Sequence, residues 1–140
     1  MQSTEHLYNE LSYYTLAHTD PSFIHQHVVD AFAAQTADEH TKPIKITFAL
    51  VGLSLYLEKN YTGKEVQRAH MKIAKHKMEW PMLILSENRG AITVVDVLGS
   101  SPGEQRDQMI HNWCVSVWEL YSKNHTQIAD FLRKYFFEKK

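Results

Sequence analysis

Residues 43–60 have the sequence PIKITFALVGLSLYLEKN, and this stretch decides the fold. Apolar residues lie on nearly every side of a helix built from it: Ile44, Phe48, Ala49, Leu50, Val51, Leu53, Leu55, Tyr56 and Leu57. A helix that is apolar nearly all round has no side suited to water, so it is typical of the buried centre of a bundle. We therefore expect other helices to surround residues 43–60.

Apolar residues recur at three- and four-residue steps in five further segments, as they do on one side of an amphipathic helix. These stripes lie within residues 7–18, 24–32, 66–74, 109–121 and 128–136. Few residues separate the last two helices, which predicts an antiparallel helical hairpin. The sequence thus predicts an all-α fold, in which residues 1–140 form a single domain, a bundle of five to six main helices.

Capping residues mark where several helices begin. In a capping box, a cap side chain and a carboxylate or amide three residues later satisfy backbone amides that would otherwise be unpaired. Boxes are predicted at Ser101–Glu104, Thr62–Glu65 and Asn124–Gln127, and Asp20 with Pro21 is expected to cap the second helix.

Residues 82–95 allow two interpretations. Their β-branched residues on both sides of a turn-like sequence are compatible with a β-hairpin. The alternative is an extended stretch that leads into one short helix around residues 94–98. The second interpretation is favoured, because Thr93 and Asp96 form a further capping box and Gly99 is placed to end a helix.

Composition limits the classes of function. The chain has 140 residues, 44% of them hydrophobic, which is enough apolar material for a folded core. Its 15 Lys and Arg and 16 Asp and Glu give a net charge of −1, which argues against nucleic-acid binding and electrostatic membrane attachment. No apolar run is long enough to span a bilayer, and the first residues lack a signal-peptide core. A single cysteine, Cys114, excludes an internal disulfide, so we expect a soluble cytoplasmic protein.

Nine histidines are the one unusual feature of the composition, and four side chains form a candidate metal set. His18 and His70 lie within apolar stripes, and the spacing of His27 and Asp30 lets two side chains share a metal. A divalent-metal site would need residues from two or three helices to converge. Core histidines with hydrogen-bond partners, and a plain hydrogen bond between His27 and Asp30, are the favoured alternatives.

The other polar side chains predict little chemistry. Four histidines are expected to be solvated, on polar helix faces or in a loop: His6, His40, His76 and His111. Gln35 points into an apolar stripe and therefore needs hydrogen-bond partners. Cys114 lies on the stripe of a long helix, where burial keeps a thiol neutral and unreactive.

Residues 25–35, with the sequence HQHVVDAFAAQ, resemble the signature H-x-x-x-V-D-A-Y-x-x-Q of an uncharacterised bacterial family of domains of unknown function. Three later stretches are also similar and follow in the same order: residues 53–58, 90–98 and 116–119 with His125. The matched positions are His25, Asp30, Gln35, Asp96, Trp118 and His125. The resemblance implies homology without an activity, and it makes His25, Gln35, Trp118 and His125 candidate ligand-binding residues.

Two departures from that family bear on a metal site. Relatives commonly have a histidine where Thr36 stands, and many have cysteines before the first helix that this chain lacks. The resemblance therefore does not carry over a metal site built on those groups. The chain is also similar in outline to DinB-like helical bundles, whose metal-dependent members act as thiol transferases or hydrolases.

Two hypotheses for the function follow. The favoured one is a binding or interaction module that forms a homo-oligomer or binds a partner protein through the aromatic face of its last helix. That face consists of Phe131, Leu132, Tyr135, Phe136 and Phe137, of which Phe137 is expected to be exposed. The alternative is a divalent-metal-dependent enzyme, a hydrolase or thiol-transferase-like protein, with its His/Asp site between helices.

Overall fold

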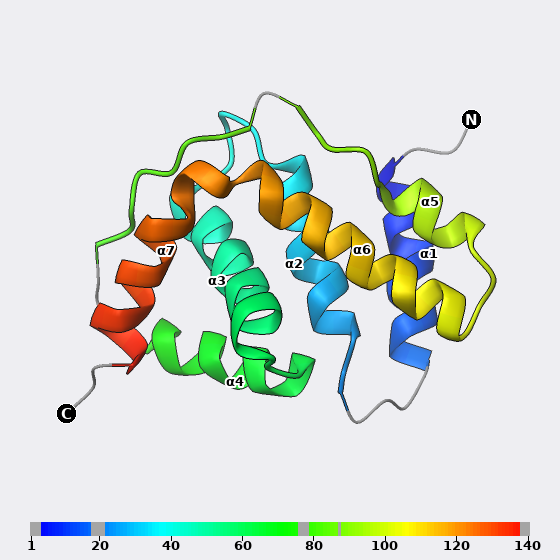
Figure 1. Ribbon diagram of the computed structural model, residues 1–140, viewed down its shortest axis with the longest axis horizontal. Helices are drawn as coiled ribbons and strands as arrows, with labels where there is room; N and C mark the ends of the chain where they lie inside the picture. The colour runs from blue at the N-terminus through cyan, green and yellow to red at the C-terminus, as the bar shows by residue number, and fades with distance from the viewer. Residues whose placement is uncertain (1–3, 18–21, 76–78, 87, 138–140) are drawn as a thin grey trace.

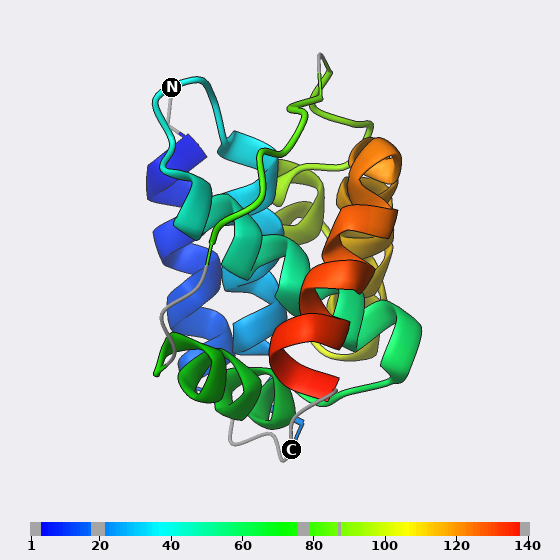
Figure 2. The same cartoon turned by 90° about the vertical axis from the view of Figure 1, so that its left-hand side faces the viewer.

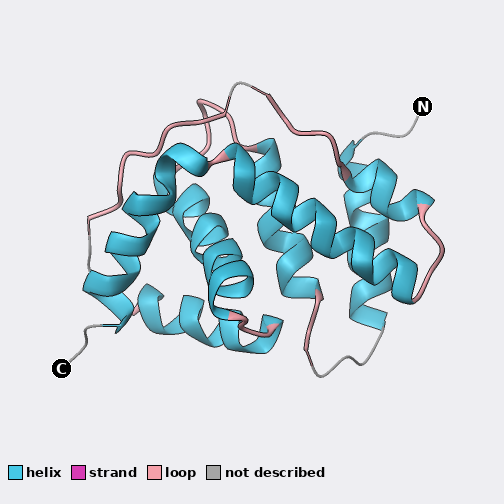
Figure 3. Cartoon of the chain, in the orientation of Figure 1, coloured by secondary structure: helices cyan, strands magenta, loops and turns pink. Residues whose placement is uncertain are grey.

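The computed structural model describes residues 4–17, 22–75, 79–86 and 88–137. These residues form seven α-helices and no strand (Figure 3), which confirms the predicted all-α fold. The helices are α1 (Thr4–Ala17), α2 (His25–Thr36), α3 (Pro43–Lys59), α4 (Gly63–Ala74), α5 (Val94–Gly99), α6 (Glu104–Leu120) and α7 (His125–Leu132). A 3₁₀ turn, Ser122–Asn124, joins α6 to α7. No helix among the described residues is both long enough and apolar enough to cross a membrane.

Helix α3 lies at the centre of the bundle, as its apolar sequence predicts. It packs against α2, α4, α6 and α7. Its residues from Ile46 to Leu55 are buried, apart from the half-buried Phe48. Helices α1 and α5 pack together at one end of the molecule, and α4 and α7 flank α3 at the other end (Figure 1).

Between α4 and α5, residues 79–86 and 88–93 cross the outside of the bundle in a largely extended conformation (Figure 2). Residues 79–86 and 88–93, named the crossing segment below, form neither helix nor strand. The segment leads directly into α5, at the place where the sequence predicts a short helix around residues 94–98. The extended stretch with its short helix is therefore confirmed, and the described residues form no β-hairpin.

Side-chain exposure alternates along the middle of the crossing segment. Met82 and Ile84 are exposed, whereas Leu83 and Leu85 are half-buried and pack against the core. An extended chain sends successive side chains to opposite sides, so this alternation is typical of a strand that lies on a core. The crossing segment thus has strand-like geometry without a neighbouring strand among the described residues.

Two of the predicted capping boxes form. The hydroxyl of Thr62 accepts a hydrogen bond from the Glu65 amide at 3.2 Å, and the Glu65 carboxylate accepts one from the Thr62 amide at 2.8 Å. Thr93 and Asp96 form a capping box at the start of α5. These two helices therefore begin where the local sequence predicts.

Two other predicted caps are wrong. Helix α6 begins after Gly103 rather than Ser101, and Gly103 has a φ of 99°, a conformation that favours glycine. The side chain of Asn124 does not cap α7, because both ends of its amide bond to the crossing segment instead. The predicted cap of the second helix, Asp20 with Pro21, lies outside the described residues.

The predicted hairpin of the last two helices is also wrong. Helix α7 turns away from α6 and packs against α3 (Figure 1). His125 helps to fix this turn, since its Nε2 donates to the carbonyl oxygen of Trp118 at 2.9 Å. A short connection therefore brings the two helix ends together without making the helices antiparallel neighbours.

Thr62→Ala should lower the free energy of unfolding by about 1 kcal/mol, because it removes the acceptor for the Glu65 amide. Ser101→Ala is the matched control and should change the stability by less than about 0.5 kcal/mol, since a serine side chain without a cap bond adds little. Urea unfolding followed by circular dichroism measures both values. Equal losses in the two variants would contradict the capping seen here.

Candidate functional site

A buried carboxyl group lies in the contact between α2 and α3. Asp30 is 3% exposed, and its Oδ1 accepts a hydrogen bond from Gln26 Nε2 at 3.3 Å. Its Oδ2 has no hydrogen-bond partner within the described part of the chain. Burial raises the pKa of Asp30 well above its ordinary value, and the bond from Gln26 opposes this effect only in part. The site therefore favours the protonated, neutral form.

Gly52 of α3 makes room for this carboxyl group. A Cβ atom on Gly52 would lie 1.8 Å from Asp30 Oδ2, far inside van der Waals contact. Glycine in a helix interior costs about 0.5–1 kcal/mol relative to alanine. The close approach of Asp30 to the α3 backbone explains why the sequence accepts this cost.

Cys114 of α6 lies near the same carboxyl group. Its Sγ donates to the carbonyl oxygen of His27 at 3.7 Å. Burial, together with the nearby Asp30, raises the pKa of the thiol. Cys114 is completely buried, which confirms its predicted burial, and a buried thiol favours its neutral form.

Tyr56 of α3 contacts both the buried His27 and the exposed His111. Its ring stacks on the ring of His27, with centroids 3.6 Å apart and planes at 13°. Its hydroxyl shares a 2.7 Å hydrogen bond with Nδ1 of His111, an exposed residue of α6. The sequence predicts that His111 is exposed but not that it bonds to Tyr56, because a polar helix face carries no sign of a partner on another helix.

The four candidate metal ligands do not converge among the described residues. His27 and Asp30 lie on α2, whereas His70 lies on α4, where its Nε2 donates to the carbonyl oxygen of Phe48 at 2.8 Å. His18 lies outside the described residues. In the described ranges, no three His, Cys, Asp or Glu side chains are placed to hold one metal ion. His70 thus matches the favoured alternative, a core histidine with its own hydrogen-bond partner.

Of the four candidate ligand-binding residues, Trp118 and His125 lie together. Their rings stack with centroids 3.8 Å apart and planes at 10°. The indole Nε1 of Trp118 donates to the carboxylate of Glu58 at 2.9 Å. The pair lies at the carboxyl end of α6. Nε1 of Trp118 and Nε2 of His125 each donate to an acceptor within the protein.

His25 and Gln35 lie at opposite ends of α2. Nδ1 of His25 shares a 2.9 Å hydrogen bond with Oγ1 of Thr15 on α1. Gln35 Nε2 donates to two carbonyl oxygens of the crossing segment, at 2.6 and 2.7 Å. Gln35 Oε1 accepts from Trp113 Nε1 at 2.9 Å. The predicted burial and pairing of Gln35 are confirmed, and its partners show that it ties the crossing segment to α2 and α6.

Asn124 holds the middle of the crossing segment. The Ile84 amide donates to Asn124 Oδ1 at 2.8 Å, and Asn124 Nδ2 donates to the Ile84 carbonyl oxygen at 2.7 Å. Asn124 is 1% exposed, so its side-chain amide is buried at one end of both bonds. The side-chain amide thus takes the place of a peptide group on a neighbouring strand. The sequence does not predict this pairing, because the two residues are 40 positions apart.

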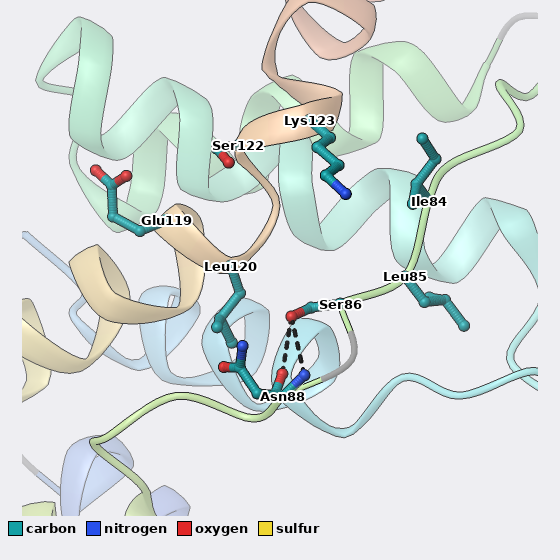
Figure 4. Close-up of a pocket in the computed structure, with 8 residues that line it drawn as sticks. All are labelled: Ile84, Leu85, Ser86, Asn88, Glu119, Leu120, Ser122 and Lys123. Carbon is teal, nitrogen blue, oxygen red and sulfur yellow. Dashed lines mark hydrogen bonds between the residues drawn. The ribbon is translucent and has the colours of Figure 1, made fainter.

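A hollow of about 400 Å³ lies beside the crossing segment (Figure 4). Leu85, Ser86 and Asn88 line one side, and Leu120 and Lys123 face them from the end of α6 and the following turn. The Lys123 ammonium group points into the hollow, and it forms no salt bridge with any residue that the structure describes. The hollow therefore combines apolar side chains with polar ones, among them the carboxylate of Glu119 and the ammonium group of Lys123.

Gly52→Ala should lower the free energy of unfolding by about 1–3 kcal/mol, because the added methyl group overlaps Asp30. Asp30→Ala removes the overlapping atoms. The loss of unfolding free energy in the double variant should therefore be smaller than the sum of the two single losses by at least about 1 kcal/mol. Urea unfolding of the wild type, the two single variants and the double variant measures this coupling. Strictly additive losses would contradict the contact.

The stability should depend on pH through Asp30. Because folding raises its pKa, the folded protein holds this proton more tightly than the unfolded chain, so stability is lost as pH rises from the ordinary pKa towards the raised one. Asp30→Asn removes that loss and should stabilise the protein at pH 7 by about 1 kcal/mol or more, with a smaller gain at pH 4. Urea unfolding at both pH values measures the gain, and an equal gain at the two would be inconsistent with a buried acid.

A family model described as "Family of unknown function (DUF5946)" matches residues 3–122, a range that includes α1 to α6. No curated protein and no solved structure matches the chain significantly. The family match covers most of the chain and confirms the resemblance to a family of unknown function. On this match, the chain belongs to DUF5946.

Proposed function

We propose that the chain is a non-catalytic binding module that pairs an extended segment of a partner protein with its crossing segment. The pairing of Ile84 on one edge only is the observation that carries this proposal. Its amide and its carbonyl both bond to Asn124, so the crossing segment is held as a strand of fixed orientation. A strand with an unpaired second edge is a template for the addition of another strand.

The second edge carries the backbone groups of Leu83 and Leu85. In an extended chain, the amide and carbonyl of one residue point to one edge, and those of the next residue point to the other edge. The edge opposite Asn124 therefore belongs to Leu83 and Leu85, whose backbone groups have no hydrogen-bond partner among the described residues. Each of the two residues offers one donor and one acceptor to a partner strand.

Exposed apolar side chains adjoin this edge. Met82 is 81% exposed and Ile84 is 55% exposed, which leaves both available for contact with a partner. Ile84 also lines the hollow that contains the Lys123 ammonium group (Figure 4). In strand addition, main-chain bonds supply affinity and such side-chain sites supply selectivity.

The aromatic face of the last helix, which the sequence favours as an interface, offers less surface. Phe131 and Leu132 are buried in the core. Phe137 is 45% exposed, as predicted, but the Lys59 ammonium group lies 5.6 Å from its ring centroid. The crossing segment therefore supports the interaction hypothesis better than this helix does.

The alternative, a divalent-metal-dependent hydrolase or thiol transferase, has less support. Its central residues, His27 and Asp30, are both buried. The α3 backbone at Gly52 closes one side of Asp30, and Cys114 of α6 lies against the His27 backbone. A substrate would need an open path to these groups, and the packed helices occupy that path.

We place the module in the cytoplasm and expect a protein as its partner. The one cysteine is a buried thiol, which suits a reducing compartment. The chain has a net charge of −1 and therefore lacks the excess of basic residues on which nucleic-acid binding depends.

Panning a peptide display library against the immobilised chain should select extended apolar peptides. Leu83→Pro should weaken the binding of a selected peptide about tenfold, because proline has no amide donor for the second edge. Leu83→Ala keeps the amide and is the matched control, with an affinity expected within about threefold of the wild type. Fluorescence anisotropy measures the affinities, and circular dichroism checks the fold. Equal affinities of the two variants, or a library that yields no binder, would overturn the proposal.

A further inference from the structure

We infer that the partner on this edge is a second copy of the same chain, paired antiparallel about a twofold axis at Ile84. This inference rests on the proposed function and names its partner. A twofold axis makes both copies contribute the same residues, so the surface must be complementary to itself. The unpaired backbone, the exposed side chains and the charges of the crossing segment each meet that condition.

The unpaired backbone groups determine the register. With Ile84 opposite Ile84 of the second copy, each Leu83 lies opposite a Leu85, and the two residues exchange amide-to-carbonyl hydrogen bonds. Such a pair forms on both sides of the axis. A shifted register that places Pro81 opposite Leu85 loses a donor, because proline has no amide hydrogen. The register centred on Ile84 therefore uses every unpaired backbone group of Leu83 and Leu85.

The same register brings exposed apolar side chains together. In antiparallel strands, two opposite residues that do not exchange hydrogen bonds have Cα atoms about 4.5 Å apart. The two Ile84 residues form such a pair, so their side chains come into direct contact. Met82 of one copy lies opposite Ser86 of the other, beside this contact. Met82 and Ile84 are both exposed in the single chain, so pairing removes apolar surface from water.

The charges at the ends of the segment favour antiparallel pairing. Glu79 lies at one end of the crossing segment and Arg89 lies near the other. Both residues are exposed, although Nη1 of Arg89 also donates to the carbonyl oxygens of Gln35 and Ala37. Antiparallel pairing brings the Glu79 end of each copy towards the Arg89 end of the other, whereas parallel pairing would place like charges together. The net charge of −1 adds little repulsion between two copies.

The small contact area limits the expected affinity of the dimer. Pairing of a few strand residues buries less than the roughly 1,200 Å² at which stable complexes begin. We therefore expect a reversible, concentration-dependent dimer with a micromolar dissociation constant rather than an obligate one.

Ile84→Cys tests the twofold axis directly. Two cysteines at a non-hydrogen-bonded antiparallel pair have a Cα separation of about 4.5 Å, which a disulfide can span. With oxidised glutathione as the oxidant, Ile84→Cys should form at least tenfold more covalent dimer than Met71→Cys. Met71, on α4, is 61% exposed and provides the matched control, and the buried Cys114 does not compete. Equal dimer yields from the two variants would overturn the pairing at Ile84.

Sedimentation equilibrium separates this inference from the proposed function. The wild type should dimerise with increasing concentration, Leu83→Pro should abolish the dimer, and Leu83→Ala should retain it. A wild type that stays monomeric at high micromolar concentration but binds a display-selected peptide overturns the second copy as partner and leaves the binding module standing. A wild type that does neither overturns both.

Discussion

Two hydrogen bonds between the Asn124 side chain and the Ile84 backbone fix the crossing segment on the bundle. The Asn124 side chain is buried, so the loss of either bond would leave one of its polar atoms unpaired at a cost of about 1–3 kcal/mol. Gln35 fastens the far end of the same segment through two backbone carbonyls. A stretch of chain without a neighbouring strand among the described residues is thereby kept extended. This restraint gives Leu83 and Leu85 an ordered outer edge, the edge on which we propose that a second strand adds.

The buried titratable groups lie at contacts between helices. Asp30 lies against the α3 backbone at Gly52, and Tyr56 stacks on His27 beside it. Burial raises the pKa of the Asp30 carboxyl group and of the Cys114 thiol, which favours the protonated form of both. These contacts join α2, α3 and α6, and Gln35 of α2 holds one end of the crossing segment. Polar residue types within a core therefore identify where helices meet, and they identify chemistry only where a substrate can reach them.

The sequence predicts those features that depend on residues close together in the chain. The apolar stretch at 43–60 predicts the central helix, and Thr62 and Thr93 predict two helix starts, because periodicity and capping are local. Asn124 shows the limit of this reasoning: it matches a capping pattern, yet its amide bonds to a peptide group far away in the sequence. Gln35 is similar, since its burial follows from its helix stripe but its partners do not. The candidate site was predicted only as far as the inward position of His27 and Asp30, because convergence between helices depends on packing that a stripe does not encode.

Amide hydrogen exchange at Leu83, Ile84 and Leu85, measured by NMR on dilute wild-type protein, tests the account most directly. The Ile84 amide should exchange at least tenfold more slowly than its two neighbours, because it alone of the three has an acceptor in the part of the chain that the structure describes. Asn124→Ala should raise the exchange rate of Ile84 to that of the neighbours. Equally fast exchange at all three amides of the wild type, or protection of Leu83 and Leu85 in the monomer, would contradict a strand that is held along one edge and unpaired along the other.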